Sequence, residues 1–261
     1  MRLRRLAPQL VLAVYLIGAV APLVAVGVFG FVNQRDGFTI EPLLALLSED
    51  SAIQPILNSV LLTVLTVVVG YAIVIPSLLW MHLRTPRLLG AAETASLLPY
   101  VIPAIALVGG VNLVLRPLFP GFFVNVLSLV PFYIIITLPF MFRTIDSGLR
   151  SLDLHTLMRA GESLGSGALR NFFTVILPNL WSAIVSGSLL VVMMASGELV
   201  MAQLMLHKTF PTMLIELGQS QVRLAAALSF ITILGSWVLM ALMVVLGRGR
   251  NATARVSQFS I

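Results

Sequence analysis

Two carboxylates, Glu93 and Glu198, stand inside long apolar stretches, where an ionisable group needs a partner or an aqueous path. Glu198 follows Ser196 and Gly197, small residues that let a neighbouring helix approach closely. Such a carboxylate either lines a path that attracts cations or forms a hydrogen bond between helices, and the spacing leaves both interpretations open. Asn58, at the start of another apolar stretch, offers the same choice. We take Glu198, Ser196 and Asn58 as candidate substrate-pathway residues.

Glu93 lies near the basic residues Arg84 and Arg87, so we expect it to reach either these side chains or water. Proline interrupts the same apolar stretch and the next one. Because proline removes a backbone donor and clashes with the preceding turn, we expect kinks at these positions. The prolines concerned are Pro99, Pro103, Pro131 and Pro139.

No catalytic motif accompanies these groups. The chain has no Cys, and its three His residues are far apart in the sequence, without the spacing of metal ligands. A phosphate-binding P-loop needs a lysine preceded by glycine. The only lysine, Lys208, follows His207, so the chain has no Walker A motif. We therefore expect a chain that is not an enzyme and that carries no cofactor or metal of its own.

The composition indicates a polytopic membrane protein. The chain is 59% hydrophobic and 10% charged, with a mean hydropathy of +1.03, whereas soluble domains carry about 25% charged residues. A helical span needs about 20 apolar residues. Six stretches qualify, at about residues 10–32, 56–81, 88–115, 122–142, 180–206 and 225–246. The first is too long for a signal peptide and is expected to be a retained helix. We expect one all-α membrane domain over residues 1–261, without internal repeats.

The 16 Lys and Arg residues predict the orientation of these helices. If the stretches alternate in direction, twelve basic residues fall on one side: Arg2, Arg4, Arg5, Arg84, Arg87, Arg143, Arg150, Arg159, Arg170, Arg248, Arg250 and Arg255. Four fall on the other: Arg35, Arg116, Lys208 and Arg223. Because cytoplasmic loops are rich in Lys and Arg, both termini are expected in the cytoplasm, together with a long loop at residues 143–179.

This loop contains a predicted amphipathic helix. Leu154, Leu157, Gly161 and Leu164 recur at helical spacing. Asp153 is a suitable N-cap, and Gly165 and Gly167 fit the end of the helix. A second short helix is expected from Ala168 to about Val175, with Pro178 in the first turn of the fifth span. So short a helix is marginal alone. It would pack on lipid headgroups or on a protein partner, and its periodicity alone leaves both open.

A spaced motif runs through the same segment: Ala160, then Gly165, nine residues, Val175, one residue, Leu177 and Pro178. It resembles the cytoplasmic signature loop of ABC-importer permeases, which reads E-A-A-x-x-x-G, nine residues, I-x-L-P. In that family the loop packs into the ATPase partner. This chain departs from the pattern at Gly161, where the second Ala is expected, and at Arg159, which reverses the charge of the leading Glu. The resemblance implies these coupling residues: Leu157, Met158, Arg159, Ala160, Gly161, Glu162, Leu164, Gly165, Leu177 and Pro178.

The resemblance extends to the six stretches, to Leu-Pro-Tyr-x-Ile-Pro at residues 98–103 and to Phe-Pro-Thr-Met at residues 210–213. It is greatest to the second permease of spermidine/putrescine-type systems. It implies a type I ABC-importer permease fold in the bacterial inner membrane, with six transmembrane helices and a coupling helix between helices 4 and 5. The implied partners are a second permease subunit, two cytoplasmic ATP-binding subunits that hold ATP and Mg²⁺, an extracytoplasmic solute-binding protein and the lipid bilayer, with no nucleic acid.

Several alternatives stay open. The expected solute is small and cationic, such as a polyamine, but importers of phosphonate, iron, sulfate or sugar fit the same motif. A secondary transporter could instead couple protons through Glu93 and Glu198, and a membrane scaffold would transport nothing. The permease pair is either homo- or heterodimeric. For Arg159, we expect the missing acidic charge to come from Glu162 or from the partner.

Overall fold

The computed structural model describes residues 2–33, 37–41, 43–44 and 50–248, which are almost entirely helical. Five stretches are long and apolar enough to cross a bilayer: Leu10–Phe31, Ile53–Arg84, Val126–Arg150, Trp181–Leu204 and Val222–Val245. A bent pair of helices supplies a sixth if it counts as one span. The chain therefore has the all-α architecture of a multi-pass membrane protein. A two-residue antiparallel pairing of β1 (Val32–Asn33) with β2 (Gly37–Phe38) is the sole strand pairing in the described ranges.

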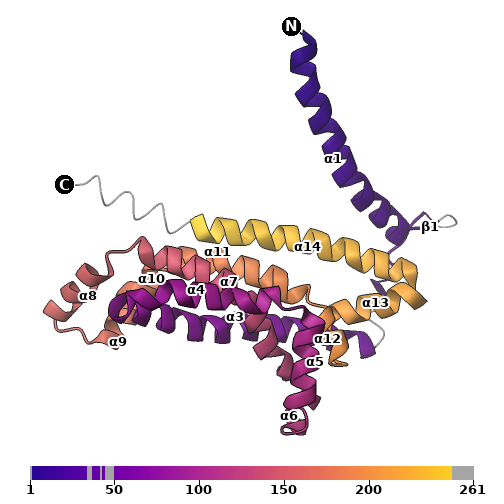
Figure 1. Cartoon of the computed structure of the whole chain (residues 1–261). Coiled ribbons are helices and arrows are strands. Elements are labelled where there is room, and N and C mark those ends of the chain that lie inside the picture. The colour runs from indigo at the N-terminus through magenta and orange to yellow at the C-terminus, as the bar shows by residue number, and fades with distance from the viewer. Residues whose placement is uncertain (1, 34–36, 42, 45–49, 249–261) are drawn as a thin grey trace.

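A bundle of four helices forms the centre of the molecule. Helix α7 (Leu129–Arg150) packs against α3 (Asp50–Arg84), α4 (Leu89–Val101) and α11 (Trp181–Ser196), and Figure 1 shows the four running along one another. Gly187 of α11 lets the helices approach, because a Cβ there would overlap Tyr71 and Thr144. The apolar core fills the spaces between these helices, and Met141, Ile145 and Leu149 of α7 are fully buried.

Two long helices lie outside this bundle. Helix α1 (Arg2–Phe31) meets α14 (Val222–Arg248) near its C-terminal end, where Gly27 faces the ring of Phe230 and Gly30 faces the backbone of Ala227. Figure 1 shows α1 leaving the bundle at a steep angle. Both helices expose apolar side chains around most of their circumference. A helix that is apolar all round needs a cover of lipid or of other protein.

The third expected stretch is two helices at 91° and not one kinked span. Helix α4 ends at Val101, and α5 begins at Ala104 and ends at Val114. Ile102 between them is extended, as expected for the residue before Pro103, because the proline ring disfavours helical geometry there. Pro99 lies within α4 and Pro139 within α7 without breaking either helix. Kinks were predicted at the prolines, and the structure has a sharp break between two helices at Pro103.

Two predicted boundaries were wrong. The fourth span was expected at residues 122–142, but α7 begins at Leu129, after α6 (Pro120–Val124) and η2 (Val126–Ser128), and continues to Arg150. Residues 143–150, expected in the loop, thus form the last two turns of α7. The apolar stretch in the sequence ends just before its first charged residue, Arg143. Burial of Ile145 and Leu149 carries the helix two turns further.

The fifth expected span is longer at one end and broken at the other. Helix α9 (Ala168–Asn171) leads through a π-helical turn, η3 (Phe172–Ile176), and α10 (Leu177–Asn179) into α11. At the other end, α11 stops at Ser196, and a short helix, α12 (Val200–Leu204), follows. Helix α13 (Phe210–Ser220) then precedes α14. It starts with a capping box, in which the Thr209 N–H donates to the Thr212 hydroxyl at 2.8 Å.

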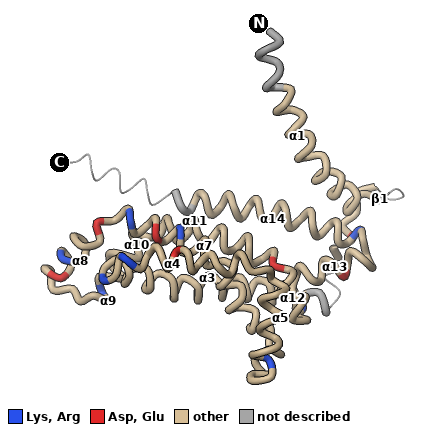
Figure 2. The backbone as a smooth tube through the Cα atoms, in the orientation of Figure 1, with Lys and Arg blue, Asp and Glu red and all other residues tan. Residues whose placement is uncertain are grey.

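Charge separates the two ends of the bundle. Helix α8 (Leu154–Ser163) and α9 lie at one end, here called the α8 end, and α12 and α13 lie toward the other, the α12 end (Figure 1). Figure 2 shows most of the blue residues gathered at the α8 end. Some basic residues of the orientation argument lie outside the described part of the structure: Arg35, Arg250 and Arg255, and the side chains of Arg2, Arg4, Arg5 and Arg248.

Candidate functional site

The predicted helix in the loop exists and has the predicted cap. Helix α8 begins after Asp153, whose carboxylate accepts hydrogen bonds from the Thr156 N–H at 3.2 Å and the Thr156 hydroxyl at 2.7 Å. These bonds, led by that of the hydroxyl, lower the pKa of Asp153 below its usual value. The helix ends before Gly165, which has a φ of +76°. This left-handed geometry favours glycine, as predicted, whereas Gly167 is extended and caps α9.

The inward face of α8 agrees with the prediction except at its last position. Leu154 and Gly161 are buried, and Leu157 and Met158 are partly buried against the core of the bundle. Leu164, expected on the same face, is 88% exposed. The helix ends at Ser163, and the turn at Gly165 directs the chain away. Leu164 therefore leaves the periodic face and projects from the surface.

Asn171 holds the two short helices together, and sequence reasoning missed it. Its side chain is 1% exposed, and its Nδ2 donates to the carbonyl oxygen of Met158 at 3.2 Å. The same amide lies against Gly161, where a Cβ would overlap it. Glycine at this position is thus required by a contact from α9. No spacing in the sequence indicates this pairing, because the two residues meet only when the chain turns at Gly165.

Several apolar side chains and two arginines are exposed on α8, on α9 and on the turns that follow these helices. Leu164, Leu169 and Phe173 are 88%, 73% and 57% exposed, and Arg159 and Arg170 are exposed on the same short helices. Ala160 and Glu162 of the expected coupling set are exposed as well. We call Arg159, Leu164, Leu169, Arg170 and Phe173 the α8–α9 surface. Arg159 forms no ion pair with Glu162 among the described side chains, so the expected partner within the chain is not engaged.

The α8–α9 surface is joined to the bundle by rigid elements on both sides. Leu177 is partly buried against the core. Pro178, expected in the first turn of the fifth span, lies in α10, just before that span begins at Trp181. From Ala168 to Ser196 the chain is helical almost throughout, including the π turn. On the other side, a short turn links α7 to α8. A displacement of α8 and α9 would therefore pass directly into α7 and α11.

A charged cluster ties α3 to α7 at the α8 end. Asp146 accepts a hydrogen bond from Arg150 Nε at 2.8 Å and pairs with His82 Nε2 at 2.8 Å. The side chains of His82 and Asp146 are only 12% and 13% exposed. This pair was not predicted, because no local spacing connects residues on separate helices. Glu93 was expected to reach either Arg84 and Arg87 or water. Its side chain is 39% exposed, and among the described side chains it pairs with Arg143, at 3.5 Å.

The candidate pathway residues lie toward the α12 end, and each has a structural hydrogen bond. Glu198 is partly buried between α11 and α12, and its Oε1 accepts from the Met201 N–H at 2.9 Å, which caps α12. Asn58 donates to the carbonyl oxygen of Lys208 at 2.8 Å and so joins α3 to the chain before α13. Ser196 is exposed and bonds within its own helix. No hydrogen bond links the three residues to one another within the described ranges.

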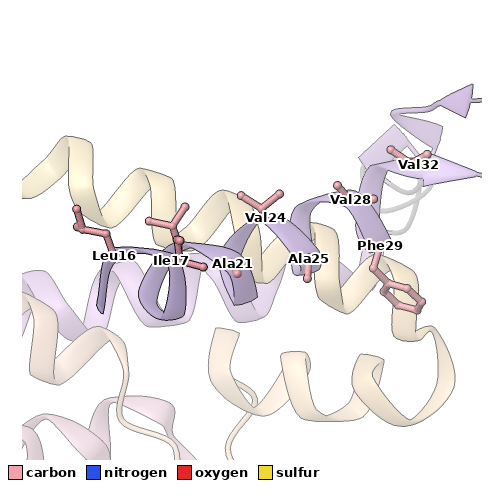
Figure 3. Close-up of a pocket in the computed structure, with 9 residues that line it drawn as sticks. Leu16, Ile17, Ala21, Val24, Ala25, Val28, Phe29 and Val32 are labelled. Carbon is pink, nitrogen blue, oxygen red and sulfur yellow. The ribbon is translucent and has the colours of Figure 1, made fainter. Parts of the chain in front are cut away.

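The groove in Figure 3 is lined by none of these candidate residues. It follows one face of α1, where Leu16, Val20, Val24, Val28 and Phe29 are among the lining residues, and no charged residue lines it. The lining comes from α1 and from Val32 of β1, which follows it directly. The groove is therefore the exposed apolar face of α1 and offers no polar group that could orient a solute. No protein-family model matches the chain, and no curated protein matches it.

Proposed function

We propose that this chain is a permease subunit of an ABC importer and that the α8–α9 surface docks a separate ATPase. The observation that carries the proposal is the exposure of Leu164, Leu169 and Phe173 beyond the end of the bundle. An apolar patch rimmed by charge is typical of a protein interface. The motif from Ala160 to Pro178 passes through the same two helices, which agrees with its resemblance to the family's signature loop.

The distribution of charge supports a cytoplasmic position for this surface. Arg116, Lys208 and Arg223 are the described basic residues toward the α12 end. The α8 end carries more: Arg84, Arg87, Arg143, Arg150, Arg159 and Arg170. By the positive-inside rule the α8 end faces the cytoplasm, where ATP is available. The partner ATPases would bind ATP and Mg²⁺, a second permease would complete the path, and a solute-binding protein would deliver solute to the α12 end.

The mechanism requires only rigid-body motion on this chain. When the ATPases close around ATP, they displace α8 and α9. The tie between Asn171 and Met158 makes these two helices move together. The movement passes into α7 and into α11 through η3 and α10. Because α11 ends beside Glu198 at the α12 end, the displacement reaches the candidate pathway residues.

The proposed solute, a small cation such as a polyamine, rests on Glu198 alone. Its Oε1 accepts from the Met201 N–H, whereas no hydrogen bond to its Oε2 is present in the described part of the chain. A capped carboxylate still attracts cations, but the cap by itself also explains why a carboxylate is there.

Site-specific cross-linking tests the docking. The chain has no native Cys, so Ala160→Cys introduces a single exposed thiol on α8. Labelled with a benzophenone maleimide, this variant is expected to cross-link to the ATP-binding subunit that co-purifies with the tagged chain. Lys208→Cys, exposed toward the α12 end, is the matched control and is expected to give no such product. A complex that transports but forms no cross-link at 160 would refute the docking, as would transport by the purified chain alone.

A further inference from the structure

Residues 102–128 form an arm that leaves the bundle sideways. Helix α5 departs at 91° from the direction of α4, which itself runs along α7. Figure 1 shows α5 and α6 projecting from one flank of the bundle. Only one side of the arm packs on protein, where Val108 and Phe123 are buried with Met201 and Ala202 of α12. If the bundle spans a bilayer, α5 lies close to the plane of the membrane.

The rest of the arm is apolar and uncovered. Its side chains at the end of α5, at the turn and at the end of α6 are among the most exposed hydrophobic groups of the described chain, with Leu113 at 80% and Val124 at 79%. The exposed members are Ile105, Leu113, Val114, Leu118, Phe119, Phe122 and Val124. Such a surface is costly in water and stable in hydrocarbon.

One charge interrupts this surface. Arg116 is the only charged residue between Glu93 and Arg143, and it is exposed at the tip of the arm, where Figure 2 shows an isolated blue segment. It takes part in no ion pair among the described side chains. Phe119 and Phe122 follow it within two turns. A cation beside aromatic rings is typical of a segment at the boundary between hydrocarbon and headgroups.

The length of α4 places the arm in the leaflet farther from α8. The exposed Arg84 and Arg87 flank the turn from α3 to α4 and mark the headgroups on the α8 side. From Arg87 to Val101 the helix rises about 21 Å, whereas the hydrocarbon is about 30 Å thick. The arm therefore leaves the bundle in the farther third of the hydrocarbon. A long Arg side chain reaches from there to the phosphates of that leaflet.

We propose that the arm is embedded in this leaflet and that Arg116 binds the phosphate of an anionic lipid headgroup. The guanidinium forms paired hydrogen bonds to phosphate oxygens, which offsets the cost of a charge near hydrocarbon. The inference needs only a membrane-spanning bundle and does not depend on the proposed transport function. The alternative is that a second transmembrane subunit covers the arm. Such a subunit would have to place an acidic group opposite Arg116 within an apolar interface.

Lipid binding by the full-length chain tests the proposal. The chain is purified in mild detergent, and retained phosphatidylglycerol is titrated by native mass spectrometry. Loss of one cation near an anionic surface corresponds to about a fivefold loss of affinity, so Arg116→Gln is expected to weaken retention about fivefold. Lys208→Gln removes another exposed cation toward the α12 end and is expected to leave retention unchanged. Arg116→Lys keeps the charge and is expected to retain most of the binding.

Equal retention by Arg116→Gln and the unmodified chain would overturn the proposal. A second measurement identifies what covers the arm. A photoreactive phenylalanine analogue at Leu118 in the assembled membrane is expected to label lipid. A cross-link from this position to another protein subunit would overturn the proposal and identify the arm as a contact between subunits.

Discussion

At the scale of residues, an inward-facing glycine of α8 and an asparagine of the next helix, α9, define the geometry of the α8–α9 surface. Gly161 occupies a position where a Cβ would overlap the Asn171 amide. The amide in turn bonds to the carbonyl oxygen of Met158. The pair acts as one unit, so the effects of changing its two members are not expected to add.

Gly161→Ala is expected to reduce ATPase assembly, because overpacking a close contact costs about 1–3 kcal/mol. Asn171→Ala in the same chain removes the overlapping amide and is expected to restore part of the loss. Gly167→Ala is the matched control, since a Cβ at 167 meets nothing and its φ of −71° suits alanine. The measurement is the amount of ATP-binding subunit that co-purifies. A Gly161→Ala chain that assembles normally would show that α8 and α9 tolerate separation.

Glu198→Gln separates the charge of this side chain from its hydrogen bond. The amide oxygen of Gln can still accept from the Met201 N–H, so we expect the thermal stability to be retained. If the solute is cationic, uptake of labelled polyamine into liposomes with the full complex is expected to fall several-fold. Glu216→Gln, exposed on α13, is the control for general loss of acidic charge. Normal uptake together with lower thermal stability would assign Glu198 to helix packing alone.

At the scale of elements, the contact of His82 with Asp146 joins α3 and α7 beside the start of α8. Asp146 contacts two side chains, since Arg150 donates to its other oxygen. Loss of the carboxylate would leave both side chains without this partner. Loss of His82 would leave Asp146 paired with Arg150.

Asp146→Ala is therefore expected to destabilise the chain most, by about 1–3 kcal/mol, because it leaves partly buried partners unsatisfied. His82→Ala is expected to cost less. Arg150→Ala is expected to cost at most about 1 kcal/mol, since the Arg150 side chain is 59% exposed and its pair with Asp146 is screened by solvent. Thermal unfolding in detergent measures the order. If Arg150→Ala proved the most destabilising of the three, the contact of His82 with Asp146 would not be the main stabilising contact of this cluster.

At the scale of the whole molecule, the chain presents apolar surface on nearly every side of the bundle and polar surface mainly at its α8 end. This distribution is that of a multi-pass membrane protein. Arg159 is exposed, and Glu162 does not pair with it in the described part of the chain. Under the proposed function, we therefore expect its acidic partner on the ATP-binding subunit.

Arg159→Glu is expected to lower assembly with the ATPase about tenfold, because a like-charge contact replaces an ion pair at an interface. Arg159→Gln removes the charge without reversing it and is expected to have a smaller effect. Folding of the isolated chain is expected to be unchanged, since Arg159 is exposed. Co-purification of the ATP-binding subunit at low and high salt measures the effect. Near-normal assembly of the Arg159→Glu chain would show that this position carries little specificity.

The sequence by itself determined the features that depend on local composition. Apolar length predicted five of the six expected membrane stretches, and the spacing of Asp153, Leu154 and Gly165 predicted α8 with its cap and its end. These features arise from interactions within a few turns of helix. They do not depend on which other segments lie nearby, and the pattern of residues is therefore enough to predict them.

Only the tertiary structure decided where those helices end and what their polar groups contact. Burial of Ile145 and Leu149 against other helices extended α7 beyond Arg143, and packing of the arm on α12 accompanies the break at Pro103. The partner of Gly161 comes from the next helix after a turn in the chain, and His82 and Arg143, the partners of Asp146 and Glu93, come from elements distant in the chain. Such contacts are set by the relative placement of whole helices, which is fixed by the sum of many apolar contacts. A short-range pattern in the sequence therefore does not predict these contacts.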